Sequence, residues 1–293
     1  MKYAWIKEQN AFSVAAICRV LCVSKSGYYK SLSPKTSQRR QRTQRIRHDV
    51  KKIYEESRQI YGSYKIAQEL QNDETMESAC RNTVAKAMKD LDLKSCVSKT
   101  FRPTTTVSDS SKTPAANVLN QNFAATAPNQ KWVTDITYLQ VTGGWVYLAA
   151  VLDLFSRKIV GWSISESLAT PLVSDALRRA VEARRPDTRQ LLHHSDRGCQ
   201  YTSDEYQKTL RTMNITCSMC RTGCCYDNAV MERFFWSLKH EWTNFESFAD
   251  IKEARQSVFQ YIETFYNQKR IHQTLGYKTP NQFENEFDGQ MAA

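Results

Sequence analysis

No apolar run in this sequence is long enough to cross a bilayer. The longest stretch, WVYLAAVL at residues 145–152, is far shorter than the roughly 20 residues that a spanning helix needs. The N-terminus also lacks a long apolar core followed by small residues, the pattern of a secretory signal. We therefore expect a soluble, cytoplasmic protein.

An even set of cysteines, which would suit a secreted disulfide framework, is also missing. The chain has nine cysteines, which indicates reduced thiols in a cytoplasm. Four lie in CSMCRTGCC, residues 217–225, and could bind zinc. Cys217 and Cys220 are an odd number of residues apart in an expected strand, so they should face opposite sides. Zinc is the less favoured interpretation, and whether this cluster binds anything stays open.

Negative charge is in deficit, and the deficit lies in one part of the chain. The net charge is +11. Residues 1–113 hold 22 Lys and Arg against 11 Asp and Glu, whereas residues 114–293 hold 19 of each. A localised basic excess is typical of a surface that meets a polyanion such as DNA. The alternative is a Lys-rich surface without a binding role, and charge alone does not decide between the two.

Two helix pairs are expected in the basic part. Residues 11–32 predict helix, turn, helix, with Ser24 as the N-cap of the second helix. Cys22 stands where such turns often carry glycine, so a helix-turn-helix and an ordinary helical hairpin are equally favoured. A basic linker from residue 34 leads to a second helix-turn-helix candidate. Its second helix begins near Arg81, Asn82 and Lys86, where base contacts would fall.

The pattern changes after residue 129. Residues 100–129 are rich in Thr, Ser, Ala, Pro and Asn and are expected to be a linker. From residue 130 the order is three strands joined by tight turns, helix, strand, helix, strand, helix. This order predicts an α/β fold: a five-stranded mixed sheet with flanking helices, the ribonuclease-H-like arrangement. The predicted regions are a helix-turn-helix-like segment (1–33), a basic helical DNA-binding region (34–99), the linker, the catalytic core (130–245), and C-terminal helices and a tail (246–293).

Three carboxylates stand out in the core. Asp135 lies within the first strand and Asp196 at the end of the fourth, and these strands are neighbours in the expected sheet. Two acids on adjacent central strands repel one another and are poorly solvated, which is tolerated where a divalent cation sits between them. Glu232 lies on the helix beside them, at the edge of its apolar sector. Lys239 follows two turns later on nearly the same line, about 10 Å away.

Such a set would hold two Mg²⁺ or Mn²⁺ ions. In that chemistry one ion activates the attacking oxygen and the other stabilises the leaving oxygen of an in-line phosphoryl displacement. Neither a cysteine nucleophile nor a Ser-His-Asp set is required. The catalytic and metal-binding residues are therefore expected to be Asp135, Asp196 and Glu232.

The sequence segments around these acids resemble those of one family. WVTDITYL, LDLFSRKIVGW, HHSDRGCQYTS, CYDNAVMERFFWSLKHE and YNQKRIHQTLGYKTP look like the second-reading-frame (OrfB-type) DDE transposases of bacterial insertion sequences in family three, within the retroviral integrase superfamily. ICRVLCVSKSGYYK and YGSYKIAQEL in the basic part are similar too. The resemblance spans nearly the whole chain and is weakest over residues 100–129.

The resemblance implies a function and its partners. The expected activity is cleavage at the ends of an insertion sequence and joining of the freed 3′-hydroxyl to DNA. Expected partners are double-stranded DNA, as terminal inverted repeats and target, a second copy of the chain, and the product of an upstream reading frame. A place on the bacterial nucleoid follows. Asp227 and Asn228 are expected to cap the catalytic helix. DNA contacts are expected from Lys239, Arg197, Tyr201, Asn228, Arg81 and Lys86.

For several residues we favour a structural role. Asp153 is expected to serve a turn, and His193 and His194 to be packed rather than bound to metal. His48 is the only histidine in residues 1–113. The His-His-Cys-Cys zinc domain of retroviral integrases needs two, so it is not expected here. The aromatics of the C-terminal part are expected in the core; they are Trp242, Phe245, Phe248, Phe259, Tyr261, Phe265 and Tyr266.

The role of YNQKRIH, residues 266–272, stays open. This segment could equally line a DNA channel or form a solvated surface. Two rival functions for the whole chain also remain: a nuclease without strand transfer, and a DNA-binding regulator whose ribonuclease-H-like domain is inactive.

Overall fold

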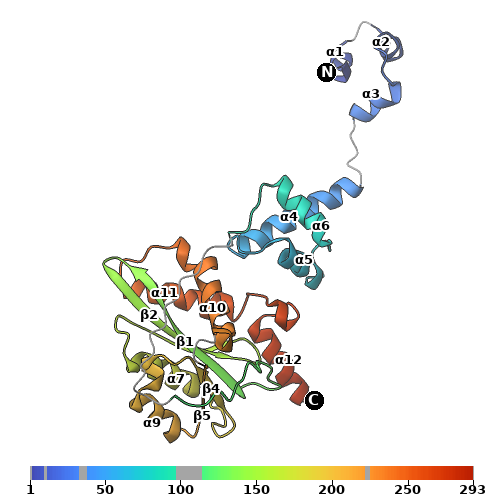
Figure 1. The fold of residues 1–293 in the computed structure, drawn as a ribbon. Helices are drawn as coiled ribbons and strands as arrows, with labels where there is room; N and C mark the ends of the chain where they lie inside the picture. Colours follow the sequence, from blue (N-terminus) through green and yellow to red (C-terminus); the bar gives the residue numbers. More distant parts are fainter. Residues whose placement is uncertain (1, 10–11, 33–37, 97–113, 222–224, 293) are drawn as a thin grey trace. The chain divides into compact units, whose positions relative to one another are not determined.

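The chain divides into two compact units in the computed structural model (Figure 1), which describes residues 2–9, 12–32, 38–96, 114–221 and 225–292. One unit is Met1–Glu56 with Ile66–Leu93, and the other is Ser57–Lys65 with Lys94–Ala293. In the described ranges, every helix is too short or too polar to traverse a membrane.

Three short helices open the chain: α1 (Lys2–Glu8), α2 (Val14–Val20) and α3 (Lys25–Leu32). Ile6, Ile17, Cys18 and Tyr28 form a small core among them. The hydroxyl of Ser24 accepts a hydrogen bond from the N–H of Gly27 at 3.3 Å, which confirms it as the N-cap of α3. Cys22 has φ of +52°, the left-handed conformation that favours glycine. The turn is therefore made at some cost in backbone strain. Helix α1 was not expected.

Helices α4 (Gln38–Glu56), α5 (Ser63–Asn72) and α6 (Arg81–Asp90) form the second helical group. Helix α4 packs on α6. The buried side chains recur at helical spacing: Ile46, Val50 and Ile53 on α4, and Val84, Ala87 and Met88 on α6. The pair α5 and α6 lies where the second helix-turn-helix was predicted.

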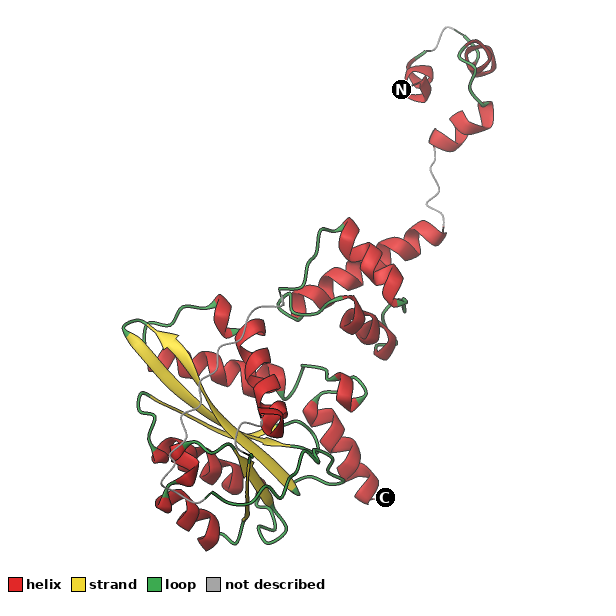
Figure 2. Ribbon diagram, viewed as in Figure 1, coloured by secondary structure: helices red, strands yellow, loops and turns green. Residues whose placement is uncertain are grey.

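A five-stranded mixed sheet forms the centre of the second unit (Figure 2). Its strands are β1 (Lys131–Val141), β2 (Gly144–Asp153), β3 (Ile159–Ser165), β4 (Leu192–Ser195) and β5 (Thr216–Met219), in the order β3-β2-β1-β4-β5. The pair β1 and β2 and the pair β2 and β3 are antiparallel, whereas β4 runs parallel to β1 and to β5. The strands, the fold class and the adjacency of β1 and β4 were all predicted.

Helices cover both faces of this sheet (Figure 1). On one face α7 (Thr170–Arg184) packs on β2 and β3, around a core that includes Trp132, Val151 and Leu177. A side chain at Gly161 would place its Cβ 2.5 Å from the carbonyl oxygen of Ala176, so only glycine permits this approach. The remaining helices are α8 (Cys199–Thr202), α9 (Asp204–Thr212), α10 (Ala229–Glu241), α11 (Ile251–Phe259) and α12 (Pro280–Ala292), with a π-helix at Gln260–Tyr266 and short 3₁₀ helices at Cys225–Asn228, Thr243–Phe245 and Gln273–Leu275.

Three parts of the chain differ from expectation. The predicted linker falls partly outside the described residues, but Asn117 and Leu119 lie against the sheet unit, with Leu119 buried. Two of the aromatics predicted for the core, Phe245 and Phe259, are 61% and 51% exposed; for them the prediction is wrong. Helix α12 is joined to the core through Glu284, which pairs with Arg184 and Lys158 at 2.9 and 3.0 Å, so it is no loose tail.

Candidate active site

Asp135 lies on β1, and Asp196 directly follows the end of β4, the parallel strand next to β1. The β1–β4 register ends with Val133 beside His194, and two further residues bring Asp135 beside Asp196. The side chain of Thr134 meets Tyr201 on the α7 side. Because side chains alternate along a strand, Asp135 points to the opposite face, where α10 packs on β1. Both carboxylates are half-buried.

Within the described residues, the charge of the two acids is only weakly compensated. Each accepts one backbone hydrogen bond through Oδ1: Asp135 from Ile136 at 2.8 Å and Asp196 from Gly198 at 2.9 Å. Burial nevertheless raises the pKa of both carboxyls, and the negative charge of Asp196 raises the pKa of Asp135 further. Glu232 adds a smaller upward contribution to the pKa of Asp135, and Lys239 a downward one. The electrostatic potential around Asp135 is therefore dominated by the neighbouring carboxylates.

Helix α10 carries Glu232 in its first turn. Asn228 stands at the N-cap position, but its side chain makes no capping hydrogen bond; instead its Nδ2 donates to the carbonyl oxygen of Thr134 in β1 at 3.1 Å. The predicted capping by Asn228 is therefore wrong, because the amide is used to tie the helix start to the strand that carries Asp135.

Asp227, just before α10, is held by a different set of donors. It accepts hydrogen bonds from the backbone and guanidinium of Arg221 and from the amides of Asn117 and Gln121, at 2.8 to 3.2 Å. The hydrogen bond from the side chain of Arg221 is the main cause that holds the pKa of this carboxyl well below its usual range. Asp227 thus anchors the start of α10 through the segment that was expected to be a linker.

Lys239 lies over an aromatic ring near the acids. Its Nζ is 4.2 Å from the ring centroid of Tyr138, three residues beyond Asp135 on β1. Burial lowers the pKa of Lys239, against the opposing effect of Asp135. The structure therefore brings Lys239, which α10 carries, within electrostatic reach of Asp135.

The segment after Asp196 shapes the site. A Cβ at Gly198 would come 3.0 Å from the Oδ1 of Asp196, so glycine leaves room for that carboxylate. Arg197 donates through Nε to the carbonyl oxygen of Cys220 at 2.6 Å. Tyr201 is 1% exposed and Asn228 is 4% exposed. Both differ from the prediction of DNA contact, because their side chains lie inside the protein and act on the site through Thr134.

The acids offer oxygen ligands of the kind that hard divalent cations prefer. Asp135 and Asp196 each engage only Oδ1 in a hydrogen bond within the described ranges. Among those residues, no three His, Cys, Asp or Glu side chains lie close enough to hold one ion. The residues present thus fit a cation at the aspartate pair, with Glu232 beside it rather than in a closed set of three. The metal-binding role of all three stays a prediction.

The remaining polar residues near the site are structural, as favoured. His193 is within hydrogen-bond reach of Tyr206 at 3.1 Å, and His194 of Ser218 at 2.8 Å; burial lowers the pKa of the two rings to about 3 and about 4. Asp153 accepts the N–H groups of Asn129 and Phe155 at 2.7 and 2.9 Å, so it serves the turn after β2.

The cysteine stretch forms no zinc site in the part that is described. Cys220 lies 3.3 Å from a ring nitrogen of His194, and Cys217 lies 3.6 Å from the amide of Gln207. No group of three candidate ligands includes either, within the same part of the chain. Cys224 lies outside the described residues.

Residues 266–272 form a solvated surface only at Gln268 and Lys269, which are exposed, whereas most of the segment is buried. Arg270 is buried and binds both carboxylate oxygens of Glu241, the last residue of α10, at 2.7 and 2.6 Å. Its guanidinium also donates to Ser237 at 3.2 Å. Asn267 bonds both the N–H and the carbonyl of Ile159 in β3. The motif therefore fastens α10 to the far edge of the sheet, and the sequence offered no local signal of this.

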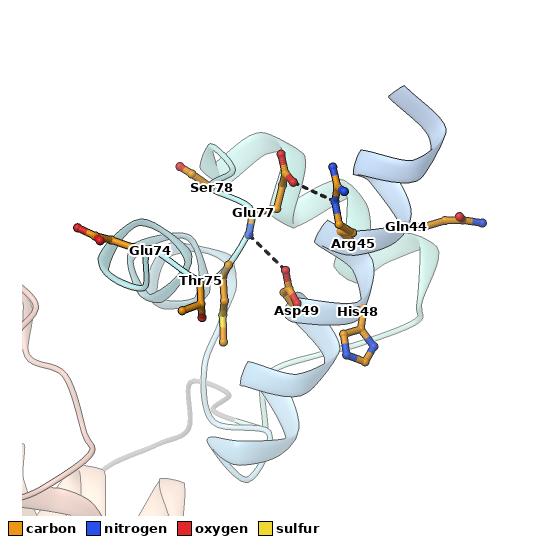
Figure 3. Close-up of a pocket in the computed structure, with 9 residues that line it drawn as sticks. Gln44, Arg45, His48, Asp49, Glu74, Thr75, Glu77 and Ser78 are labelled. Carbon is orange, nitrogen blue, oxygen red and sulfur yellow. Dashed lines mark hydrogen bonds and ion pairs between the residues drawn. The ribbon is translucent and has the colours of Figure 1, made fainter. Parts of the chain in front are cut away.

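The basic unit contains a pocket of about 730 Å³ between α4 and the loop before α6 (Figure 3). Its charged groups are mostly occupied with one another. Glu77 pairs with Arg42 and Arg45 at 2.9 and 3.0 Å, and its N–H donates to Asp49 at 3.4 Å. These contacts therefore hold the loop before α6 against α4, and they indicate a structural role for the pocket rather than a catalytic one. On α6, Arg81 and Lys86 are exposed, as DNA contact requires.

Sheet order, flanking helices and the paired acids together define a ribonuclease-H-like integrase core behind a helix-turn-helix-like region. Family models agree: an integrase core domain matches residues 125–225 and 213–280, and an HTH-like domain matches residues 41–100. The transposase InsF of insertion sequence IS3A from Escherichia coli K12 is 41% identical over 98% of this chain and 99% of its own length. The chain belongs to the IS3 family of insertion-sequence transposases.

Two further likenesses are more distant. A 31 kDa protein of insertion element IS600 from Shigella sonnei is 38% identical over 94% of this chain and the whole of its own length. The solved catalytic core of HTLV-2 integrase, in complex with magnesium, is 17% identical with a TM-score of 0.42, over 55% of this chain and 99% of that one.

Proposed function

We propose that this chain cleaves DNA at the ends of its insertion sequence and joins the freed 3′-hydroxyl to another phosphodiester. The observation that carries the proposal is the pair Asp135 and Asp196. Asp135 lies on β1 and Asp196 directly follows β4, the neighbouring parallel strand; the pKa of both carboxyls is raised, and that of Asp135 in part by the charge of Asp196. Family membership supports the substrate.

The chain's residues would share the work in distinct roles. Asp135 and Asp196, with Glu232 beside them, would hold Mg²⁺ or Mn²⁺, two ions in the reaction as proposed. When bound, such ions activate an attacking oxygen and stabilise a leaving one in phosphoryl displacement. Gly198 leaves the space that Asp196 occupies, and Asn228 fixes the start of α10 against β1. Lys239 would bind a phosphate next to the cleaved bond, because a lysine near carboxylates can balance charge that DNA brings.

DNA recognition would come mainly from the basic unit. Arg81 and Lys86 are exposed on α6, the second helix of the helix-turn-helix pair, whose early residues usually reach base edges. Arg197 would meet DNA beside the acids. Transposition brings two ends together, so a second copy of the chain is the proposed partner, and the product of an upstream reading frame is a further one. The proposed location is the bacterial nucleoid.

The test is a cleavage and joining assay with the ends of the encoding element and Mg²⁺. The unaltered chain should cleave and join, whereas Glu232→Gln should do neither while still binding the DNA. Glu205→Gln, which changes an exposed acid on α9, is the matched control and should keep both steps. Cleavage without joining would favour the nuclease, and binding alone by the unaltered chain would favour the regulator.

A smaller change tests the proposed phosphate contact. Lys239→Ala should weaken binding of the element end, and the slope of log affinity against log salt should fall by about 1, since one phosphate contact is lost. Lys208→Ala, an exposed lysine on α9, should leave the slope unchanged. If the two variants behave alike, Lys239 makes no phosphate contact.

A further inference from the structure

The β1–β2 hairpin continues past the catalytic acids. Strand β4 ends at Ser195, so beyond Asp135 no described strand pairs with β1 on that side. Strand β1 runs on to Val141, paired with β2 from Gly144 (Figure 1). The part of the hairpin beyond Asp135 therefore borders the site without contributing to the centre of the sheet.

This part of the hairpin carries a pair of aromatic rings, one half-buried and one exposed. Tyr138 and Trp145 meet edge to face, with ring centroids 5.0 Å apart and an interplanar angle of 88°. Trp145 is 49% exposed. An indole normally buries most of its surface. A tryptophan that stays exposed while it packs against a second ring therefore indicates a surface on which a planar ligand can stack.

The ring pair is joined to the reaction site by Lys239. The lysine Nζ lies 4.2 Å from the centroid of Tyr138. Tyr138 is three residues from Asp135, which along a strand is about 10 Å, and this odd separation turns the two side chains to opposite faces of β1. Lys239 lies near both, because Asp135 also acts on the pKa of this lysine. Cation and rings thus lie within the length of a few nucleotides from the carboxylates.

The hairpin tip is held in place. Thr142 donates through both its N–H and its hydroxyl to the carbonyl oxygen of Phe248, at 2.9 and 3.2 Å. Val141 also forms a β-bridge with Phe248. The backbone under the rings is therefore tied to the segment that follows α10, and ordering the rings costs little when a ligand arrives.

We propose that Tyr138, Trp145 and Lys239, here called the stacking platform, take up one unpaired base of the DNA strand whose end lies at Asp135 and Asp196. This inference rests on the proposed function. Every nucleobase has a π-face that stacks on an aromatic ring, and a nearby cation meets the phosphate that comes with it. Unpairing a base is least costly where the duplex already ends. An exposed tryptophan supported by a half-buried tyrosine, with a cation next to the pair and near a phosphoryl-transfer site, suits such a base.

Binding to defined DNA tests the platform without any chemistry. The full chain with Glu232→Gln would be titrated with a fully paired duplex and with one of equal length whose end is unpaired, both of arbitrary sequence because stacking tolerates any base. The unpaired end should bind about tenfold tighter, the range expected for one stacked base. Trp145→Ala should abolish that preference and Trp145→Phe should keep most of it.

The control is Phe259→Ala, because Phe259 is 51% exposed on α11 and lies outside the platform; the preference should persist. The proposal is overturned if the preference for the unpaired end survives Trp145→Ala. It is also overturned if the chain with both rings intact shows no such preference. Photocrosslinking of 5-iodouracil in the unpaired end should label Trp145, and this decides the case if the alanine variant does not fold. Because neither readout needs cleavage, a chain that binds but fails to cleave would overturn the proposed function alone.

Discussion

Acids that are buried or half-buried occur in two settings within the same unit. At one end of α10, Glu241 is closed into an ion pair with Arg270, and burial, which would raise its pKa, is outweighed so that the pKa is lowered. Near the other end, burial raises the pKa of Asp135 and Asp196, and the charge of Asp196 raises the pKa of Asp135 further. Asp227, just before α10, follows the first pattern through Arg221.

This difference separates acids that hold the fold from acids available for chemistry. A buried carboxylate is normally matched by a cation or several donors, because an unmatched one is costly. Among the described residues, that match is made for Glu241 and Asp227 but not for Asp135 and Asp196, and the missing positive charge is one that a ligand can supply. Perturbed acids gathered in this way are a recognised mark of functional sites.

The largest expected effect comes from breaking the matched pair. Arg270→Met should lower the free energy of unfolding by about 3–5 kcal/mol, because it leaves the carboxylate of Glu241 buried and unpaired. Urea denaturation measures this. Arg255→Met, which changes an exposed arginine on α11, should cost less than about 0.5 kcal/mol. A double variant, Arg270→Met with Glu241→Leu, should recover part of the loss; if it is no better than the single variant, the pair is not what stabilises this end of α10.

A somewhat smaller loss is expected at Asp227. Asp227→Asn keeps the shape but turns one acceptor oxygen into a donor that faces other donors, at a cost of about 1.5–3 kcal/mol. Because its folded pKa is depressed, the stabilisation by the native carboxylate is present above the unfolded pKa and is lost as pH falls through the folded pKa. Asp175→Asn, at an exposed pair with Arg178, should change little. If Asp227→Asn and Asp175→Asn lower the free energy of unfolding equally, the donors around Asp227 do not stabilise the fold.

Asp135 should respond in the opposite direction. Asp135→Asn removes the repulsion with Asp196 and should raise the free energy of unfolding at neutral pH by about 0.5–2 kcal/mol, the gain typical of replacing a strained functional residue. The same variant should lose cleavage. Thermal and urea unfolding measure the first effect, and a loss of stability in this variant would place Asp135 among the structural acids.

The smallest effect is the pH dependence of that gain. The folded pKa of Asp135 is raised, so the folded state holds its proton more tightly than the unfolded chain does. The resulting stability is complete below the unfolded pKa of about 3.9 and is lost as pH rises through the folded pKa. The advantage of Asp135→Asn should therefore grow from about pH 4 upward. An advantage that is the same at every pH would point to packing rather than charge.

The sequence predicted the sheet and the positions of the acids in it well, because both depend on local patterns. Alternation and apolar runs marked β1 to β5 to within a few residues, and the adjacency of β1 and β4 followed from the fold they imply. The placement of Asp135 beside Asp196 then required only the parallel register. Motif spacing indicated Glu232 and Lys239 on the same helix.

What escaped prediction depends on contacts between distant residues. Arg270 and Glu241 are 29 residues apart, and nothing near either residue signals a buried pair. Asn117 and Gln121 lie in a stretch without periodicity, yet both bond to Asp227 more than 100 residues later. Phe245 and Phe259 look like core residues by composition alone, and only the packing of the helices shows that they face solvent.

The most direct test of the division between matched and unmatched acids is the effect of Mg²⁺ on thermal unfolding. A ligand that binds only the folded chain stabilises it by about 2.7 kcal/mol at a hundredfold excess over its Kd. Mg²⁺ should raise the unfolding temperature of the unaltered chain and of Asp175→Asn, and should lose that effect in Asp135→Asn and in Asp196→Asn. No shift in the unaltered chain, or an equal shift in all four proteins, would contradict the assignment of these two acids to a cation.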